Sequence, residues 1–403
     1  MAIERYLTKV NSVISNYILP LGLFFFLTGI LFFKSISAYH TQIYLFLILP
    51  ALILVLSKRD QFTPILTSRA FQILLVLIVY AMLSLFWNDL SIDDFKYIKR
   101  LLIIVLFILA VIAIGKESPD KIIKLLLIAA GIYGIAAYYS FFDDYLINNM
   151  AISERIVGLG NLSNPLLSSH IYGIFTAFLI TYFFAIKRNW KKDLILILIF
   201  AGLLGFLILT HSRTPLVALS MVFLLLLWMH KSRAVLYFFL IICAIAAIYF
   251  SFNYDQLIQR GLSHRPEIWS IVMEKISHNP IFGTGLGSDI YIYIEDLKTT
   301  FTDSHNIHLG LTYLLGIVGL LLWLIFLVSL LTVYAKNKTT LIAQIGIVLL
   351  VYGMSAGMTE GGSFFSRPKE VWFLTWLPIA LLLTAEFNRL TIKSPDKNSD
   401  RNH

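Results

Sequence analysis

Long apolar segments recur along the whole chain and are separated by mostly short polar connections. A helix needs about 20 apolar residues to cross a hydrocarbon layer about 30 Å thick, and these segments reach or approach that length. The pattern predicts spans at 15–33, 41–57, 70–87, 98–115, 122–142, 166–186, 194–211, 214–230, 234–252, 306–333, 341–358 and 371–387. We therefore expect an all-α polytopic membrane protein with about 12 transmembrane helices.

The composition agrees with a protein embedded in lipid. Of the 403 residues, 58% are hydrophobic and only 14% are charged, which is far from the balance of a soluble domain. We expect a single integral membrane domain over residues 1–403. The formal net charge of +9 lies mostly in the connections assigned below to the cytoplasm. Anionic lipid headgroups explain that charge, so membrane lipids are expected partners and nucleic acid is not.

The distribution of basic residues orients the spans. The N-terminus, the even-numbered connections and the tail hold the larger share of the 32 Lys and Arg residues. Because cytoplasmic loops carry the excess of positive charge, both termini are predicted to be cytoplasmic. The polar tail, residues 388–403, is expected to be disordered.

Three connections on the outer side are long: 142–165, 253–305 and 359–370. Outer loops that gather over one bundle are where a site facing away from the cytoplasm would assemble. The longest loop, 253–305, contains a helical pattern that begins near Arg265 and is too short to span. Pro266 suits its first turn and Pro280 ends it, so we expect an amphipathic helix against the membrane face or the bundle.

The glycines after this helix resemble a nucleotide-binding loop only superficially. No strand precedes Gly283, Gly285 and Gly287, and no helix with Lys-Ser or Lys-Thr follows them. A flexible return to the membrane is the simpler interpretation. The next span contains Gly310, Gly316 and Gly319. We expect these glycines to permit close contact with other helices, as small residues do in bilayers.

An arginine on the outer side is an exception to the positive-inside rule, and Arg213 is the clearest exception in this chain. It lies in the turn "LTHSRTPL" between two long apolar segments. Such a residue can anchor to headgroup phosphates, or its planar guanidinium can bind a substrate phosphate in two-point fashion. Arg265 begins the loop helix, where the helix dipole disfavours a cation, and it is either a solvated charge or part of a site. Arg155, in the loop 142–165, is a further candidate for substrate binding.

The segment "TDSHNIHLG" places polar groups at the mouth of the span 306–333. His305 can serve as an interfacial hydrogen-bonder or, because imidazole titrates near neutral pH, as a general base for a hydroxyl. Asn306 beside it is a candidate for substrate binding. Asp303, His305 and His308 can also be read as metal ligands, but they lack the full set of a closed site. We expect no metal and no cofactor.

These motifs resemble those of a known family. The sequence "SHN", nine residues and then Gly316-x-x-Gly319 is similar to the His-Asn-x9-Gly-x-x-Gly signature of the lipopolysaccharide O-antigen ligases. The turn 210–213 and the segment 265–287, with its "NPxxGxGxG" pattern, resemble two further landmarks of that family. The span number, the length and the late outer loop match as well.

The resemblance implies a metal-independent, inverting glycosyltransferase at the periplasmic face of the bacterial inner membrane. The donor is expected to be an undecaprenyl-diphosphate-linked glycan, and the acceptor a hydroxyl of the lipid A-core oligosaccharide. By the same resemblance, Arg213 and Arg265 hold the diphosphate and His305 activates or positions the acceptor hydroxyl. Cationic stabilisation of a leaving diphosphate and a base for the acceptor are what this chemistry requires.

Two other functions remain open at this point. An O-antigen or exopolysaccharide polymerase uses the same donor, and it shares the histidine, the arginines and the loop. Gly319 is followed by Leu320 where the ligases often carry an aromatic residue. A transporter or flippase would place ionisable residues near span midpoints or show paired halves, and the sequence shows few such charges and no two-fold repeat. Sugar identity and oligomeric state are not indicated.

Overall fold

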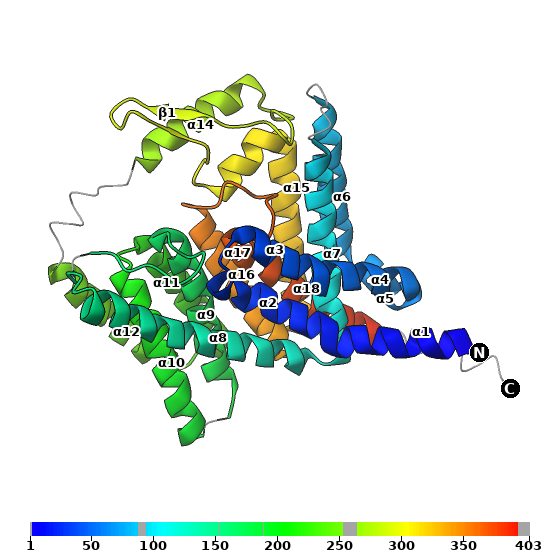
Figure 1. Cartoon of the computed structure of the whole chain (residues 1–403). Coiled ribbons are helices and arrows are strands. Elements are labelled where there is room, and N and C mark those ends of the chain that lie inside the picture. Colours follow the sequence, from blue (N-terminus) through cyan, green and yellow to red (C-terminus); the bar gives the residue numbers. More distant parts are fainter. Residues whose placement is uncertain (1, 88–93, 153, 188, 253–263, 394–403) are drawn as a thin grey trace.

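The computed structural model describes residues 2–87, 94–152, 154–187, 189–252 and 264–393, and helices dominate it (Figure 1). Each of the twelve predicted spans falls on a helical segment. Within the described residues, ten helices are long and apolar enough to cross a membrane. The other two predicted spans fall on shorter apolar helices, Arg233–Ile245 and Leu341–Gly357. The prediction of an all-α polytopic membrane protein is confirmed.

Two early spans contain a proline and are continuous helices with a wider turn. Pro20 and Pro50 each follow a π-helical turn, because a ring nitrogen cannot donate and the ring displaces the preceding carbonyl. The first half of the chain comprises α1 (Ala2–Val13), η1 (Ile14–Ile18), α2 (Leu19–Phe32), α3 (Ile36–Ile43), η2 (Tyr44–Ile48), α4 (Leu49–Ser57), α5 (Arg59–Leu66), α6 (Arg69–Leu83), η3 (Ser84–Trp87), α7 (Phe95–Glu117), α8 (Pro119–Phe141) and η5 (Phe142–Ile147).

The second half includes the deeply buried last helix and carries the long outer loops 253–305 and 359–370. Its elements are α9 (Pro165–Ala185), α10 (Trp190–Leu209), α11 (Arg213–His230), α12 (Arg233–Phe252), α14 (Arg265–His278), β1 (Ile292–Ile294), β2 (Thr299–Phe301), α15 (Ile307–Asn337), α16 (Leu341–Gly357), α17 (Glu370–Leu374) and α18 (Trp376–Lys393). The α18 helix is almost wholly buried against α7, α15 and α16. By contrast, α15 exposes many large apolar side chains, as a lipid-facing helix does.

One boundary of the predicted tail is wrong. The α18 helix continues to Lys393, so residues 388–393 are helical and not part of a disordered tail. Asn388 donates to the carbonyl of Gly115 on α7 at 3.1 Å, which ties this last turn to the bundle. The remaining tail, 394–403, and the first part of the long loop, 253–263, lie outside the described residues.

The long loop contains the predicted helix and an additional two-stranded sheet that the sequence patterns did not indicate. Ile268 and Val272 of α14 pack with Ile292 and Ile294 of β1 in a small apolar cluster of their own. Strands β1 and β2 pair antiparallel, with Tyr293 opposite Thr300. Figure 1 shows α14 and β1 together at one end of α15, which α14 also contacts. The helix therefore rests on the bundle through its own small core.

The glycine-rich segment after α14 is not a flexible return to the membrane, as the sequence suggested. It pairs with a break in α15 at Gly316, whose φ of 63° and ψ of −168° are not helical. The amides of Thr284 and Gly285 donate to the carbonyls of Tyr313 and Leu314 at 2.9 Å. The loop thereby satisfies backbone groups that the break releases.

The pairing also runs in the other direction. On the far side of the break, the amides of Ile317 and Val318 donate to the carbonyls of Pro280 and Ile281 at 2.9 and 3.2 Å. The Tyr80 hydroxyl donates to the carbonyl of Leu315 at 3.1 Å. Unpaired backbone groups are very costly in an apolar setting, so an interrupted helix persists only where other protein groups repair it. We call this set of hydrogen bonds between residues 280–285 and the break in α15 the seam. Its partners lie far apart along the chain, which explains why local sequence patterns did not reveal it.

We predict that Gly316→Ala lowers the melting temperature of the purified protein clearly. Its φ lies in the left-handed region, and an added Cβ would collide with the backbone of Ile281. The strain should cost about 1–3 kcal/mol. Gly131→Ala is the matched control, because the nearest atom to its added Cβ, on Ile199, would lie at an ordinary 3.8 Å. Equal melting temperatures for both variants, measured by intrinsic fluorescence in one detergent, would contradict the seam.

Candidate functional site

The segment that follows α16 is the meeting point of the candidate residues. Met358 caps α16, and Thr359 and Glu360 begin the outer loop 359–370; each of the three accepts or shares a hydrogen bond from a different part of the chain. The partners belong to the start of α11, the start of α14 and the residues just before α15. Three loops far apart in sequence therefore converge here.

Glu360 is the centre of an ion-pair network. Its carboxylate accepts a hydrogen bond from the Nη2 of Arg265 on one oxygen, and the Nδ1 of His305 lies 3.3 Å from the other. The Glu360 side chain is only 5% exposed, whereas those of Arg265 and His305 are 20% and 27% exposed. A carboxylate can only accept, so the Nδ1 of His305 carries the hydrogen. The Nε2 of the ring takes no part in this pairing.

The pairing shifts both ionisations toward the charged forms. The hydrogen bond to Glu360 raises the pKa of His305 above its ordinary value of 6.5, and burial only partly opposes this. Burial alone would raise the pKa of Glu360, but the hydrogen bond from His305 and the charge of Arg265 outweigh it and hold the pKa below 4.5. Glu360 loses this stabilisation as pH falls through its folded pKa, and His305 loses its own as pH rises through its folded pKa. The pair therefore stabilises the fold most between about pH 4.5 and 6.5.

A second anchor holds Arg265. Its Nε donates to the carbonyl of Thr359 at 3.0 Å, next to the residue that its Nη2 contacts. Two nitrogens of the guanidinium are thus fixed by adjacent residues of one loop. The first residue of α14 is therefore oriented by α16, and the unfavourable charge at the helix start is offset by the buried carboxylate.

Arg213 and Arg155 meet at the turn between α10 and α11. Arg213 is the first residue of α11, and the next residue, Thr214, shares a 3.0 Å hydrogen bond with the hydroxyl of Thr359. Arg155 braces the same turn, since its Nε donates to the carbonyl of Thr210 at 2.7 Å and its Nη2 donates to the hydroxyl of Ser212 at 2.9 Å. The arginines predicted from sequence thus lie in neighbouring parts of one assembly.

His305 lies just before α15, and its backbone is in the left-handed region with φ of 47°. Asp303 holds this conformation, because its Oδ1 accepts the His305 amide at 2.7 Å and the Gly362 amide at 3.0 Å. Asn306 caps α15 through the amides of His308 and Leu309 and donates to the carbonyl of Met358 at 2.9 Å. Both ends of the Asn306 amide are therefore used within the protein, where they position His305.

Sequence reasoning missed Glu360. The loop 359–370 had been singled out as long and outer, but a lone acid in "MTEGGS" has no spacing that marks it. The available signal was electrostatic. Two candidate cations and a histidine on the outer side need a buried counter-charge if they are to converge, and Glu360 is an acid in the loop opposite them.

The interpretation of Asp303, His305 and His308 as metal ligands is not supported by the positions of their side chains. Within the described residues, no three His, Cys, Asp or Glu side chains are grouped so as to hold a metal ion. The acid nearest in sequence, Asp303, is occupied by backbone amides and by the Ser363 hydroxyl at 3.3 Å. The side chains that the site offers for chemistry are a histidine, a carboxylate and arginines.

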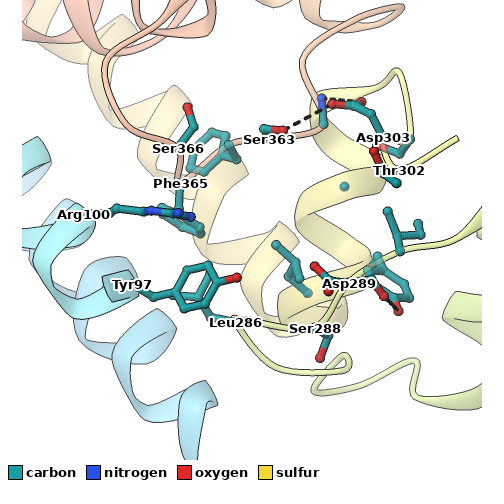
Figure 2. Close-up of a pocket in the computed structure, with 18 of the residues that line it drawn as sticks. Tyr97, Arg100, Leu286, Ser288, Asp289, Thr302, Asp303, Ser363, Phe365 and Ser366 are labelled. Atoms are coloured by element: carbon teal, nitrogen blue, oxygen red, sulfur yellow. Dashed lines mark hydrogen bonds between the residues drawn. The ribbon is translucent and has the colours of Figure 1, made fainter. Parts of the chain in front are cut away.

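A cavity of about 480 Å³ lies beside the loops that carry this network, although Arg265, His305 and Glu360 are not in its lining. Its lining includes Asp303 and Ser304, which precede His305, and Gly362 and Ser363, which follow Glu360. Figure 2 shows Asp303 and Ser363 on one side of it and Arg100 of α7 on the other. A reactant in this space would lie beside the histidine loop.

We predict that Glu360→Gln lowers the pKa of His305, because it removes the hydrogen-bonded charge that raises this pKa. The rate of diethylpyrocarbonate modification of His305, followed by mass spectrometry against pH, reports the neutral imidazole. Its midpoint should lie above 6.5 in the parent protein and move down in Glu360→Gln. Glu267→Gln removes an exposed acid that pairs with a different histidine, His264, and should leave the midpoint unchanged. A midpoint that Glu360→Gln does not move would contradict the pairing.

Comparison with known proteins shows what this chain is similar to. Residues 196–324, which include Arg213, Arg265 and His305, match the family described as O-antigen ligase. An O-antigen ligase of Pseudomonas aeruginosa is 33% identical over 380 residues, which cover 94% of this chain and 93% of the relative. Similarity of that degree over nearly the full length of both proteins shows common family membership. The chain belongs to the O-antigen ligase family.

Proposed function

We propose that this protein is an O-antigen ligase that transfers a glycan from undecaprenyl diphosphate to a hydroxyl of the lipid A-core oligosaccharide. The observation that carries the proposal is the Arg265–Glu360–His305 network beside a cavity large enough for a sugar. This transfer needs a base for the acceptor hydroxyl and cations for the leaving diphosphate. A histidine oriented by a carboxylate, with arginines nearby, can supply both. The similarity to an O-antigen ligase supports the same reaction.

In the proposed reaction, the Nε2 of His305 accepts the proton of the acceptor hydroxyl. The acceptor oxygen then bonds to the anomeric carbon of the donor sugar, while the bond from that carbon to the diphosphate oxygen breaks. Glu360 fixes the ring with the Nδ1 hydrogen toward itself and stabilises the imidazolium that forms, as the carboxylate of a catalytic triad does. Undecaprenyl diphosphate leaves, and a single displacement of this kind inverts the anomeric carbon.

The leaving diphosphate gains negative charge, and cations must stabilise it. Arg213 stands at the start of α11, where the helix dipole adds positive potential, and Arg265 keeps part of its guanidinium fork beyond the bonds to Thr359 and Glu360. We assign the diphosphate to these two residues. Arg155 supports the turn of Arg213, and Asn306 positions His305. Because the arginines supply the charge, transfer should persist in a chelator.

We place the site on the periplasmic face of the inner membrane, with both termini cytoplasmic. The excess of basic residues in the even-numbered connections supports this orientation. It puts the loops that carry Arg155, Arg265, His305 and Glu360 on one side of the bilayer. The water-exposed loops and a lipid-linked donor would then meet at the periplasmic surface of the membrane.

Lipopolysaccharide from a strain lacking this gene tests the function. Bare lipid A-core with accumulated lipid-linked polymer is the expected result for a ligase, and the intact gene should restore the polymer ladder on gels. Core that carries a single repeat would instead identify a polymerase, which uses the same donor and a second lipid-linked glycan as acceptor. Normal lipopolysaccharide in the deletion strain would contradict both.

We predict that His305→Ala lowers the transfer rate of the purified protein by about 10²–10⁴-fold, which is the usual contribution of a general base. His308→Ala is the control, because it changes a histidine three residues further into α15 and should lose far less. The rate of the parent protein should fall as pH drops through the His305 pKa, which lies above 6.5. Near-normal turnover by His305→Ala, or a flat rate from about pH 5 to 8, would remove the base role.

A further inference from the structure

We propose that the cavity beside the His305 loop binds the acceptor and that Arg100, Arg367 and Lys369 hold a phosphate substituent of its sugars. This inference rests on the proposed function, because it assigns one substrate of that reaction to one cavity. It adds a second group of cations, separate from the arginines assigned to the donor diphosphate.

The three cations that form this cation wall all line the cavity and come from two elements. Arg100 comes from the outer end of α7, and Arg367 and Lys369 come from the loop before α17. Among the ion pairs of the described residues, none involves any of the three. Cations that converge without a paired carboxylate repel one another, and an anion between them relieves the repulsion. The wall is thus suited to a negatively charged ligand.

Arg100 carries the strongest sign of an absent partner. Its Nε is buried and makes no hydrogen bond within the protein. The guanidinium lies over the ring of Tyr97, 4.7 Å from the ring centre, and Figure 2 shows it extending toward Phe365. A buried donor without an acceptor costs free energy, and a ligand oxygen that accepted from this guanidinium would remove that cost.

The rest of the lining suits the neutral part of a sugar. Ser288, Thr302 and Ser363 contribute hydroxyls and Asp289 contributes a carboxylate, and Figure 2 shows these side chains around the space opposite Arg100. The aromatic rings of Tyr97, Tyr313 and Phe365 provide apolar surface. A cavity of about 480 Å³ with a few polar groups on an aromatic lining is within the usual range for small-molecule sites.

A neighbouring cavity extends the site away from the cations. It has a volume of about 490 Å³ and shares Ser288 and Tyr313 with the first cavity. Trp87 and Phe282 line it, with ring centres 5.9 Å apart. The two spaces together offer a path longer than one sugar, which an oligosaccharide acceptor needs.

The position relative to His305 assigns the cavity to the acceptor. Asp303 and Ser304 line it, and they immediately precede the residue that takes the acceptor proton in the proposed reaction. The lining includes neither Arg213 and Arg265, assigned to the donor diphosphate, nor His305 itself. An acceptor would therefore reach the histidine at the edge of the cavity where Asp303 and Ser304 lie. An acceptor sugar in this cavity would present its hydroxyl to the histidine loop from the side opposite the cation wall.

Binding of delipidated core oligosaccharide to the purified protein in detergent tests this inference without requiring transfer. Two probes differ only in their phosphates: the native phosphorylated core and the same core after enzymatic dephosphorylation. Isothermal titration should show at least about ten-fold tighter binding of the phosphorylated probe, as expected for a charged hydrogen bond. Arg100→Gln should abolish this preference. Lys99→Gln changes an exposed cation outside the lining and should preserve it.

Arg367→Gln provides a second test, because Arg367 is exposed and its loss is not expected to affect folding. In a transfer assay, both cavity variants should raise the KM for phosphorylated acceptor and leave kcat and the KM for donor near the parent values. Equal binding of the two probes by the parent protein would overturn the inference and leave the cations to headgroup phosphates of the surrounding lipid. A raised KM for donor in the variants would overturn it in favour of a donor site. If the deletion strain refutes ligation, the titration still decides the ligand of the cavity.

Discussion

The structure of the candidate site depends on one buried negative charge. Glu360 is nearly inaccessible to water, and an unpaired carboxylate in such a place would cost several kcal/mol. Arg265 and His305 pair with it from two different loops. The start of α14, the residues before α15 and the end of α16 must therefore meet for the charge to be tolerated. The same requirement places His305, which can act as a base, near Arg265, a cation that can bind a phosphate.

A second constraint brings the long loop to the right depth. The α15 helix is interrupted at Gly316, and its broken backbone is completed by the segment after α14. Since the groups released by the break have no other partner in an apolar setting, the loop is held in one register against the helix. The small core shared by α14 and β1 then fixes the loop helix above that seam. Arg265 is carried to Glu360 by this chain of contacts.

The sequence predicted the membrane segments well, because a span is a local property of some 20 residues. It also indicated Arg213, Arg265 and His305 as candidates, since charge and imidazole at apolar boundaries are conspicuous and their spacing resembles a family signature. Glu360 and the break at Gly316 were not predictable in the same way. A lone acid and a lone glycine carry no pattern of their own, and their roles follow only from partners many residues away. The loop strands were missed for the same reason, as each has three residues.

A double-mutant cycle of thermal stability on Arg265 and Glu360 tests the central claim most directly. Glu360→Gln leaves Arg265 without its carboxylate, and Arg265→Gln leaves the buried charge of Glu360 with His305 but without its arginine. Breaking a buried pair typically costs about 3–5 kcal/mol. The double variant carries neither charge, so it should melt at a higher temperature than at least one of the single variants, with clear non-additivity. Additive losses, in which the double variant is the least stable by the sum of the two, would contradict the claim that the buried charge of Glu360 organises the site.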